Sequence, residues 1–366
     1  MFCNQVSFDF TEGKYLFQLL SAHSGSVSVL VPEHGLFAEL QDQVPVENLS
    51  AYRDLDKSVG FVSLYINTPD KTDHIAESLD GIDTLIIDIQ DIGVRYYTFL
   101  PTIAELFKVL IDKSLKLPVV VLDRPNPAGR QVEGTILKEE YSSLIGLTGL
   151  PHRYGLTLGE LCMFLRSKYN GDFPLQILNK EEDTMPVNPS PNIPGINTCR
   201  IFSGQCLLEG TNLSEGRGTT RPFEIFGAPF LKDLPGDWVE NWNKRNKEAV
   251  LRPIQFVPAF HKHKDQLCYG FQLHQGKKIH SLLYSLKMIR SLKKNLSEMK
   301  WLEGPYEAGS ERPAIELVVG DEDLIGYLNA TVKAETIQNM IHDQEKKWIE
   351  MVQPYLLYDE PLFQVY

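Results

Sequence analysis

Short apolar runs alternate with amphipathic stretches through the first half of the chain. Four runs rich in Val, Ile and Leu occupy residues 27–31, 59–66, 85–87 and 119–122, and each ends at Gly, Pro, Asn or Asp. Between them, residues 72–79 and 98–115 carry apolar side chains at helical spacing. A fifth apolar run covers residues 175–178. Buried strands that alternate with helices predict an α/β fold with a Rossmann-like, doubly wound parallel sheet.

The pattern changes after residue 180. Residues 181–194 hold four prolines and show no periodicity, which indicates a linker or a long loop. Beyond it we expect helices at residues 238–250 and 279–292, short strands at 254–257 and 269–273, and a buried helix face over residues 337–352. The sequence therefore predicts two domains, 1–183 with the parallel sheet and a smaller α+β domain at 184–366.

Polar residues follow the ends of the predicted strands. Because ligands bind outside the carboxyl ends of strands in open α/β sheets, these side chains are candidates for a shared site. The candidates are Glu33, His34, Asp88, Asp91, Arg95, Tyr97, Asp123, Arg124 and Asn126. The alternative is that they cap turns and form ordinary ion pairs, since these residue types are common in turns.

A second polar stretch covers residues 209–230, which hold four glycines and two prolines. Loops of this kind carry function when a scaffold positions them, and Glu209, Glu215, Arg217 and Arg221 are the candidates. The alternative is an ordered loop whose arginines and glutamates satisfy one another.

Composition narrows the class of protein. The 366 residues carry a net charge of −12, which argues against a protein that binds nucleic acid through the phosphate backbone. Five cysteines without a CxxC pair favour reduced thiols and a cytoplasmic protein. We find no apolar run long enough to span a membrane and no signal peptide; a segment preceding residue 1 would change the expected location to periplasmic or secreted. The oligomeric state stays open.

No common catalytic motif is present. The chain lacks GxSxG, a P-loop, a GxGxxG after the first strand, and HExxH. We interpret His261, Lys262 and His263 as surface side chains, because no acidic or Cys partner is near them in sequence. The carboxylates and arginines at the strand ends suit either a hydrolase or a binder of a polar, anionic small molecule.

Seven ordered motifs add a family resemblance. They are PEHG (32–35), DIQDIGVRYYT (88–98), LDRPNP (122–127), VEG (132–134), GLTLGE (155–160), PSPNIP (189–194) and EGTNLSEGRGTTRPFEIFGAPF (209–230). This set resembles the NamZ-type exo-β-N-acetylmuramidases, glycoside hydrolase family 171 (former DUF1343), over nearly the whole chain. The resemblance implies a Rossmann-like domain, a smaller second domain and an active cleft between them.

The resemblance also implies a reaction and a set of roles. The family releases β-1,4-linked N-acetylmuramic acid from the non-reducing ends of peptidoglycan fragments, without a cofactor or metal. Its catalytic glutamate falls on Glu33, and we add Asp88 and Asp91 as catalytic candidates. The residues assigned to substrate binding are His34, Arg95, Tyr97, Asp123, Arg124, Asn126, Glu215 and Arg217.

Two alternatives stay beside this interpretation. After PEHG the family usually continues with an aromatic residue, Arg and Gly, whereas this chain has residues LFAE at 36–39, which leaves room for an idle sugar-binding protein. A metal-dependent hydrolase built from Glu33, His34, Asp88 and Asp91 is the second. We further expect Arg95 or Arg217 to bind the lactyl carboxylate of muramic acid.

Overall fold

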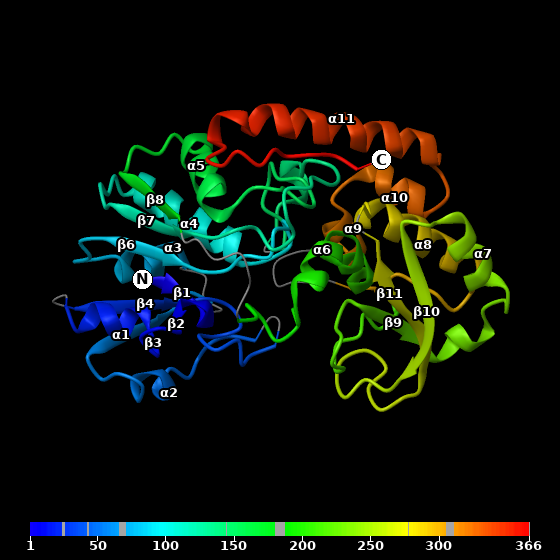
Figure 1. The fold of residues 1–366 in the computed structure, drawn as a ribbon, viewed down its shortest axis with the longest axis horizontal. Coiled ribbons are helices and arrows are strands. Elements are labelled where there is room, and N and C mark those ends of the chain that lie inside the picture. Colours follow the sequence, from blue (N-terminus) through cyan, green and yellow to red (C-terminus); the bar gives the residue numbers. More distant parts are fainter. Residues whose placement is uncertain are drawn as a thin grey trace.

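The computed structural model describes residues 1–23, 26–41, 44–65, 71–143, 145–179, 187–276, 278–304 and 311–365. The chain forms two lobes, each built on its own sheet. Helix α11 (Ala334–Val352) lies across the top of both lobes (Figure 1). Helix α11 therefore covers both lobes on one side of the molecule.

The first lobe is built on a six-stranded sheet in which all neighbouring strands are parallel. Across the sheet the strands are β5 (Val59–Ser63), β4 (Val27–Val31), β1 (Phe2–Cys3), β6 (Leu85–Asp88), β7 (Val119–Asp123) and β8 (Leu175–Asn179). Taken in chain order within this sheet, they follow the Rossmann arrangement 3-2-1-4-5-6. The predicted α/β class and doubly wound parallel sheet are confirmed.

Both faces of this sheet are buried. On β4, Val29 and Val31 pack in one apolar cluster with Phe17 and Phe61, while Leu30 belongs to a second cluster on the other face. This alternation is what period-two side chains produce in a sheet covered on both sides. The covering helices are α1 (Leu16–Ser21), α2 (Ser50–Arg53), α3 (Lys71–Ser78), α4 (Phe99–Asp112) and α5 (Leu158–Lys168).

Strand β1 was not predicted, although it occupies the middle of the sheet. Phe2 pairs with Leu30 of β4 on one side and with Ile87 of β6 on the other. The strand order reverses at β1, so the topological switch point lies between β1 and β6. The residues that follow β4, β1 and β6 therefore meet at the edge of the sheet where such folds bind ligands.

The second lobe contains a three-stranded antiparallel sheet, with the order β10-β11-β9. Its elements are α6 (Ile196–Gln205), β9 (Ile225–Ala228), α7 (Trp238–Arg245), β10 (Ala249–Phe256), β11 (Cys268–Gln275), α8 (Ser281–Asn295), α9 (Ala314–Val319) and α10 (Glu322–Leu328). The prediction of a helix to residue 250 is wrong at its end, because Ala249 already pairs with Gln275 of β11.

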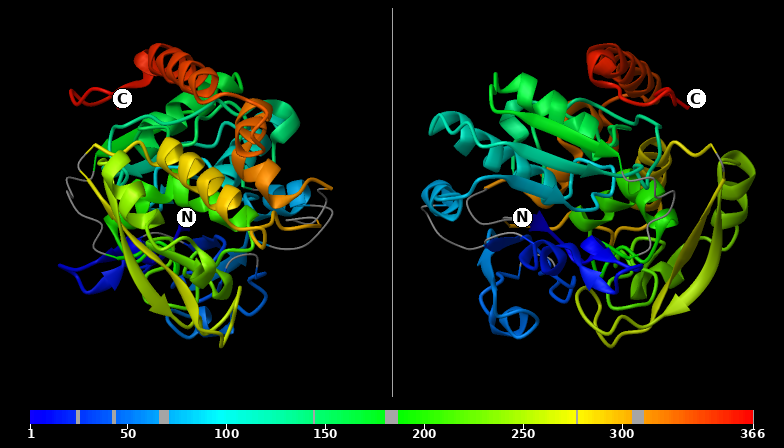
Figure 2. Two further views of the ribbon diagram at one scale, coloured as in Figure 1. Left: turned by 90° about the vertical axis from the view of Figure 1, so that its right-hand side faces the viewer. Right: turned by 60° about the vertical axis from the view of Figure 1, so that its left-hand side comes forward.

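The end of the chain returns to the first lobe. On α11, Trp348 packs edge-on against Phe164 of α5 and donates its Nε1–H to the carbonyl of Tyr154 at 2.8 Å. The amide of Leu357 then donates to Glu160 Oε1 at 3.0 Å. Figure 2 shows α11 outside the two sheets in both views. The predicted domain boundary at residue 183 lies outside the described residues.

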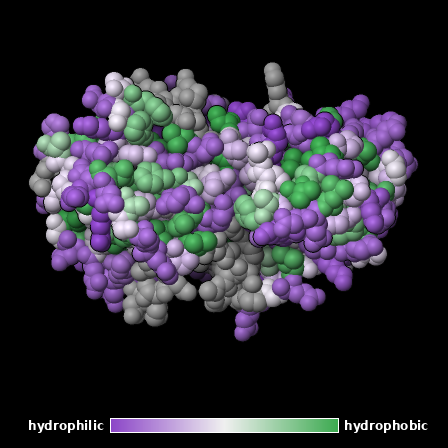
Figure 3. Space-filling view, turned by 90° about the horizontal axis from the view of Figure 1, so that it is seen from below, coloured by the Kyte–Doolittle hydropathy of each residue, from purple (hydrophilic) through white to green (hydrophobic). Residues whose placement is uncertain are grey.

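The face seen from below in Figure 3 mixes hydrophilic and hydrophobic side chains over both lobes. Within the described ranges, no helix combines the length and the apolar character that a membrane span requires.

Candidate active site

Glu33 and His34 occupy a tight turn directly after β4. His34 has φ 70° and Gly35 has φ 81°, so two successive residues adopt the left-handed conformation. Glycine accepts this conformation freely, whereas for His34 it costs free energy of order 1 kcal/mol or more. Backbone strain of this kind is concentrated at functional sites, and His34 directly follows Glu33 in this turn.

Two contacts hold this turn against the neighbouring segments. The hydroxyl of Thr98, at the start of α4, donates to Glu33 Oε2. His34 Nδ1 lies 3.0 Å from the carbonyl of Leu40, and because a carbonyl only accepts, Nδ1 carries the proton in this contact. The ring of His34 lies 5.8 Å from that of Tyr97. The exit of β4 is therefore joined to the segment that follows β6.

Asp91 is buried three residues beyond the end of β6. Its Oδ2 accepts hydrogen bonds from the amide of Gly93, at 2.8 Å, and from the hydroxyl of Tyr154. Burial raises the pKa of Asp91 to about 6, although the hydrogen bonds from Tyr154, Gly93 and the amide of Ile92 limit the rise. The site thus contains a carboxyl group that is partly protonated near neutral pH.

Tyr97 connects the two carboxyl groups. Burial raises the pKa of the Tyr97 phenol well above its ordinary value, and the charges of Glu33 and Asp91 add to that rise. Both carboxyl groups therefore lie within electrostatic reach of one phenol. The structure brings Glu33, His34, Asp91 and Tyr97 together, as the strand-exit argument predicts.

Asp88 and Arg124 form a buried ion pair at the ends of β6 and β7. Arg124 Nη2 lies 2.5 Å from Asp88 Oδ1 and also donates to the carbonyl of Val6 at 3.3 Å. Both side chains are buried. The pair therefore ties together the segments that follow β1, β6 and β7, next to the switch point.

The side chains of Asp123 and Asn126 form hydrogen bonds within the protein that stabilise the segments after β7. Asp123 Oδ1 accepts from the amides of Arg124 and Gly159, and its Oδ2 accepts from the hydroxyls of Thr157 and Tyr358, at 2.7 to 3.0 Å. Burial raises the pKa of Asp123. Asn126 donates to the carbonyl of Leu156 at 2.8 Å and accepts from the amide of Ala128 at 2.8 Å. These contacts hold the start of α5 on the sheet edge.

Arg95 lies inside the protein rather than at the surface of the site. Its Nη1 donates to the carbonyl of Thr135 at 2.8 Å, and its Nη2 donates to the carbonyl of Val319 at 2.9 Å and lies 3.0 Å from His152 Nε2. Burial lowers the pKa of Arg95 to about 10. The guanidinium thus joins three chain segments, including one from the second lobe.

Glu215 is the centre of a charged cluster in the second lobe. Its carboxylate lies 3.3 Å from Arg217 Nη1, 3.0 Å from Lys262 Nζ and 2.9 Å from His261 Nδ1. Arg217 Nη1 also donates to Glu209 Oε1 at 2.8 Å. Burial alone would raise the pKa of Glu215, but Lys262, His261 and Arg217 outweigh it and hold this pKa well below its ordinary range.

His261 is exposed, in agreement with its interpretation as a surface side chain, whereas Lys262 and His263 are half-buried. Lys262 and His261 both contact Glu215, which precedes them by more than 40 residues, and His263 Nε2 lies 2.7 Å from the carbonyl of Asn212. Their partners are distant in sequence, so no local pattern could have identified them. Within the glycine-rich loop, Arg217 pairs with Glu209 and Glu215, which is the arrangement that the alternative of mutually satisfied charges expects.

Aromatic rings connect the two groups of candidates. Tyr97 lies 6.5 Å from Phe202 of α6, and Phe202 lies 4.4 Å from Phe223. The guanidinium of Arg217 lies 4.9 Å from the ring of Phe223. The site at the sheet edge and the glycine-rich loop of the second lobe are thus joined by a continuous aromatic contact.

The candidates do not form a metal centre. In the part of the chain that the structure describes, no three His, Cys, Asp or Glu side chains come together so that they could hold a metal ion. His34 is directed to a carbonyl and Asp88 to a guanidinium.

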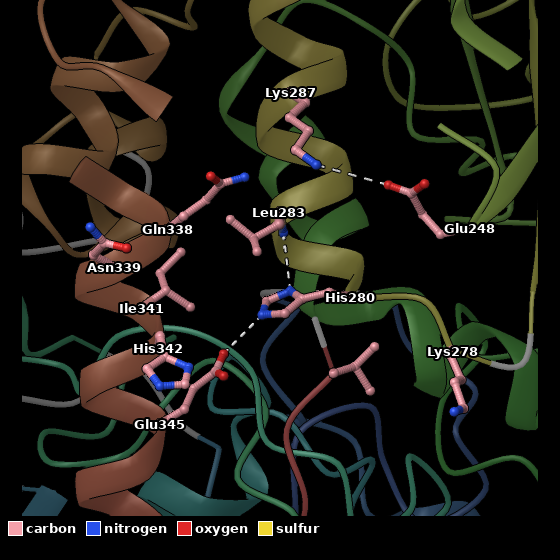
Figure 4. Close-up of a pocket in the computed structure, with 11 residues that line it drawn as sticks. Glu248, Lys278, His280, Leu283, Lys287, Gln338, Asn339, Ile341, His342 and Glu345 are labelled. Atoms are coloured by element: carbon pink, nitrogen blue, oxygen red, sulfur yellow. Dashed lines mark hydrogen bonds and ion pairs between the residues drawn. The ribbon is translucent and has the colours of Figure 1, made fainter. Parts of the chain in front are cut away.

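A separate cavity of about 580 Å³ lies between α8 and α11 (Figure 4). His280 and Glu345 line it, with His280 Nε2 2.8 Å from Glu345 Oε1. Lys287, on α8, lies 3.9 Å from Glu248. Two pairs of charged groups that line this cavity are thus directed at one another.

The comparisons with known proteins agree with this architecture. Residues 1–197 match the family profile described as "Exo-beta-N-acetylmuramidase NamZ, N-terminal", and residues 200–358 match its C-terminal counterpart. The chain belongs to the NamZ family. The family resemblance of the seven motifs is therefore confirmed.

Individual members of the NamZ family support the assignment. The chain is 34% identical over 331 residues to the peptidoglycan beta-N-acetylmuramidase NamZ of Bacillus subtilis, which covers 86% of this chain and 75% of that protein. Two DUF1343 family proteins of Bacteroides fragilis share the fold, with TM-scores of 0.77 and 0.71 at 22% and 24% identity. Each covers 98% of this chain, and the chain covers 93% of each.

Proposed function

We propose that this protein is an exo-acting peptidoglycan β-N-acetylmuramidase, a glycoside hydrolase that releases terminal N-acetylmuramic acid. One observation carries the proposal: both NamZ domains extend over nearly the whole chain, and a relative of that activity is 34% identical over most of it. The buried carboxyl groups of Glu33 and Asp91, at the ligand-binding edge of the sheet, are consistent with glycoside hydrolysis.

Hydrolysis of a glycoside needs a proton donor and a second carboxylate. We assign Asp91 as the donor, because burial without a paired cation keeps part of it protonated near neutral pH. We assign Glu33 as the second carboxylate. The bond from the anomeric carbon to the leaving oxygen breaks, and that oxygen takes the proton of Asp91. In an inverting reaction, a water oxygen forms the new bond and gives its proton to Glu33. In a retaining reaction, Glu33 first forms a glycosyl ester; water then attacks the anomeric carbon, the bond to Glu33 breaks, and the proton of that water goes to the ionised Asp91.

Asp88 is less suited to the role of proton donor. Its carboxylate lies 2.5 Å from the guanidinium of Arg124, in a pair that also holds the carbonyl of Val6. A proton donor must be protonated before the reaction, and protonating Asp88 would remove the negative charge that faces the buried guanidinium of Arg124, which costs several kcal/mol. We therefore assign a structural role to Asp88 and Arg124, which hold the neighbouring strand ends together.

The purified protein is expected to release the aglycone from a chromogenic β-N-acetylmuramic acid glycoside at a steady rate, and far more slowly from the matching N-acetylglucosamine glycoside. Absorbance of the released aglycone measures both rates. Binding of the muramic acid glycoside without turnover would instead support the sugar-binding alternative. Turnover that a chelator abolishes and a divalent ion restores would support the metal-dependent one.

Arg95→Met is expected to lower stability and to reduce activity on both glycosides by the same factor. Loss of the guanidinium removes its hydrogen bonds to the buried carbonyls of Thr135 and Val319, at about 1–3 kcal/mol for a carbonyl left unsatisfied, although His152 Nε2 stays 3.1 Å from the carbonyl of Val319. The melting temperature and the ratio of kcat/KM for the two substrates test this. If kcat/KM falls more for the muramic acid glycoside than for the N-acetylglucosamine glycoside, Arg95 binds the lactyl carboxylate after all. Arg217→Met is measured in the same way.

A further inference from the structure

Tyr154 contacts Asp91 from a segment more than 60 residues later in the chain. Tyr154 is almost completely buried, and its hydroxyl donates to Asp91 Oδ2. Its backbone is fixed as well, since its carbonyl accepts the Nε1–H of Trp348 at 2.8 Å. Tyr154 thus connects helix α11 to the carboxyl group that we assign as the proton donor.

The two oxygens of Asp91 have different surroundings. Oδ2 accepts from both Tyr154 and the amide of Gly93. Oδ1 is buried and has no hydrogen bond of normal geometry from a described residue; the nearby amide of Ile92, which helps to limit the pKa of Asp91, makes no such bond to either oxygen. Gly93 cannot be replaced freely in this turn, because it has φ 85° and a Cβ there would lie 2.1 Å from Asn126 Oδ1. The orientation of the carboxyl group is therefore determined by its neighbours.

We propose that Tyr154 is a positioning residue, which occupies Oδ2 of Asp91 so that the transferable proton resides on Oδ1. This inference rests on the proposed function. Two donors on Oδ2 leave that oxygen little capacity to carry a proton, so the acidic proton is directed to the oxygen with an open hydrogen-bonding position. The same hydroxyl stabilises the ionised carboxylate, and so sets the pH at which Asp91 loses its proton.

The titratable side chains around Asp91 are neutral, so Tyr154 acts on its protonation mainly through a hydrogen bond. The titratable side chains coupled to it are Tyr97, Tyr154, Cys162 of α5 and Cys199 of α6. Burial raises the pKa of all four, so each is uncharged at neutral pH. Among the described residues, no Lys, Arg or His forms an ion pair with Asp91. The neutral hydroxyl of Tyr154 is therefore its principal side-chain donor.

Tyr154→Phe tests the inference, because it removes the hydroxyl and keeps the ring. The limb of the pH profile of kcat/KM that reports Asp91 is expected to move to higher pH by about one unit. Tyr96→Phe is the matched control, since the hydroxyl of Tyr96 is also buried but donates to the carbonyl of Ser203 at 3.0 Å. A Tyr154→Phe enzyme with lower activity and an unmoved limb would overturn the proposal.

A second measurement separates this inference from the proposed function. Infrared spectroscopy of protein with 13C-labelled aspartate follows the protonation of Asp91 without substrate, with Asp91→Asn used to identify the band. We expect Tyr154→Phe to move that titration upward by a similar amount. An unmoved titration overturns the inference, whatever the activity, whereas absence of turnover in the native enzyme overturns the proposed function itself.

A substitution at the same position covers the case in which Tyr154→Phe fails to fold. A 3-fluorotyrosine at position 154 keeps the ring and the hydroxyl but makes the hydroxyl a stronger hydrogen-bond donor. The titration of Asp91 is then expected to move to lower pH, opposite to the effect of Tyr154→Phe. A movement in the same direction as that of Tyr154→Phe would contradict the proposed contact.

Discussion

Glu33→Gln is expected to reduce kcat for a β-N-acetylmuramic acid glycoside by about 10³-fold or more, while binding of the sugar is retained. The amide cannot take a proton from water or form a glycosyl ester, so either form of the reaction loses its carboxylate. It keeps an oxygen that accepts the hydroxyl of Thr98, which is the contact that Glu33 makes at the start of α4. Folding should therefore be preserved.

Steady-state kinetics and calorimetric binding of the substrate measure the two parts of this prediction. Glu39→Gln is the matched control, because Glu39 lies in the same turn but is exposed, with its Oε2 accepting from the amide of Phe37 at 3.0 Å. That variant should stay within a few-fold of the native rate. If Glu33→Gln retains more than a tenth of native turnover, the catalytic carboxylate lies elsewhere.

The fold could be predicted where local pattern decides the structure. The strand predicted at residues 27–31 coincides with β4, and the apolar run predicted at residues 119–122 lies within β7. Strand β1 contains only two residues, so alternation of side chains cannot reveal it. Helix α6 was missed because it is only ten residues long and polar and small residues make up most of it. A Cβ at Gly204 would lie 2.1 Å from the carbonyl of Ser281, so the glycine serves a close approach to α8.

The sequence predicts the location of the candidate site better than it predicts the function of each residue in it. Strand ends that meet at one sheet edge bring Glu33 and Asp91 into one region, and this follows from topology alone. The roles depend on partners that are remote in sequence. Arg95 bonds to Val319, which lies 224 positions later, and Asp123 bonds to Tyr358, 235 positions later. No pattern within a single stretch contains those contacts.

Asp91→Asn is expected to lower kcat by about 10²–10⁴-fold and to change how stability depends on pH. The ordinary pKa of an aspartate is 3.8, and burial raises that of Asp91 to about 6 in the folded protein. Between these values the folded protein holds a proton that the unfolded chain has released. The contribution of Asp91 to stability is therefore fully present below about pH 4 and is lost as the pH rises through 6. Above pH 7 the ionised carboxylate destabilises the native protein by up to about 3 kcal/mol.

The asparagine side chain does not titrate, so the variant should become more stable relative to the native protein as the pH rises from 4 to 7. If the amide nitrogen of the asparagine takes the position of Oδ1, it is buried without an acceptor, which lowers the stability of the variant. This loss of stability is the same at both pH values, so it cancels in the comparison. We expect the difference in melting temperature, variant minus native, to increase by on the order of 5 °C over this range. Asp80→Asn, at an exposed position, should show no such change. An equal difference at both pH values would show that Asp91 does not hold a proton in the native site, and the role of proton donor would pass to another carboxyl group.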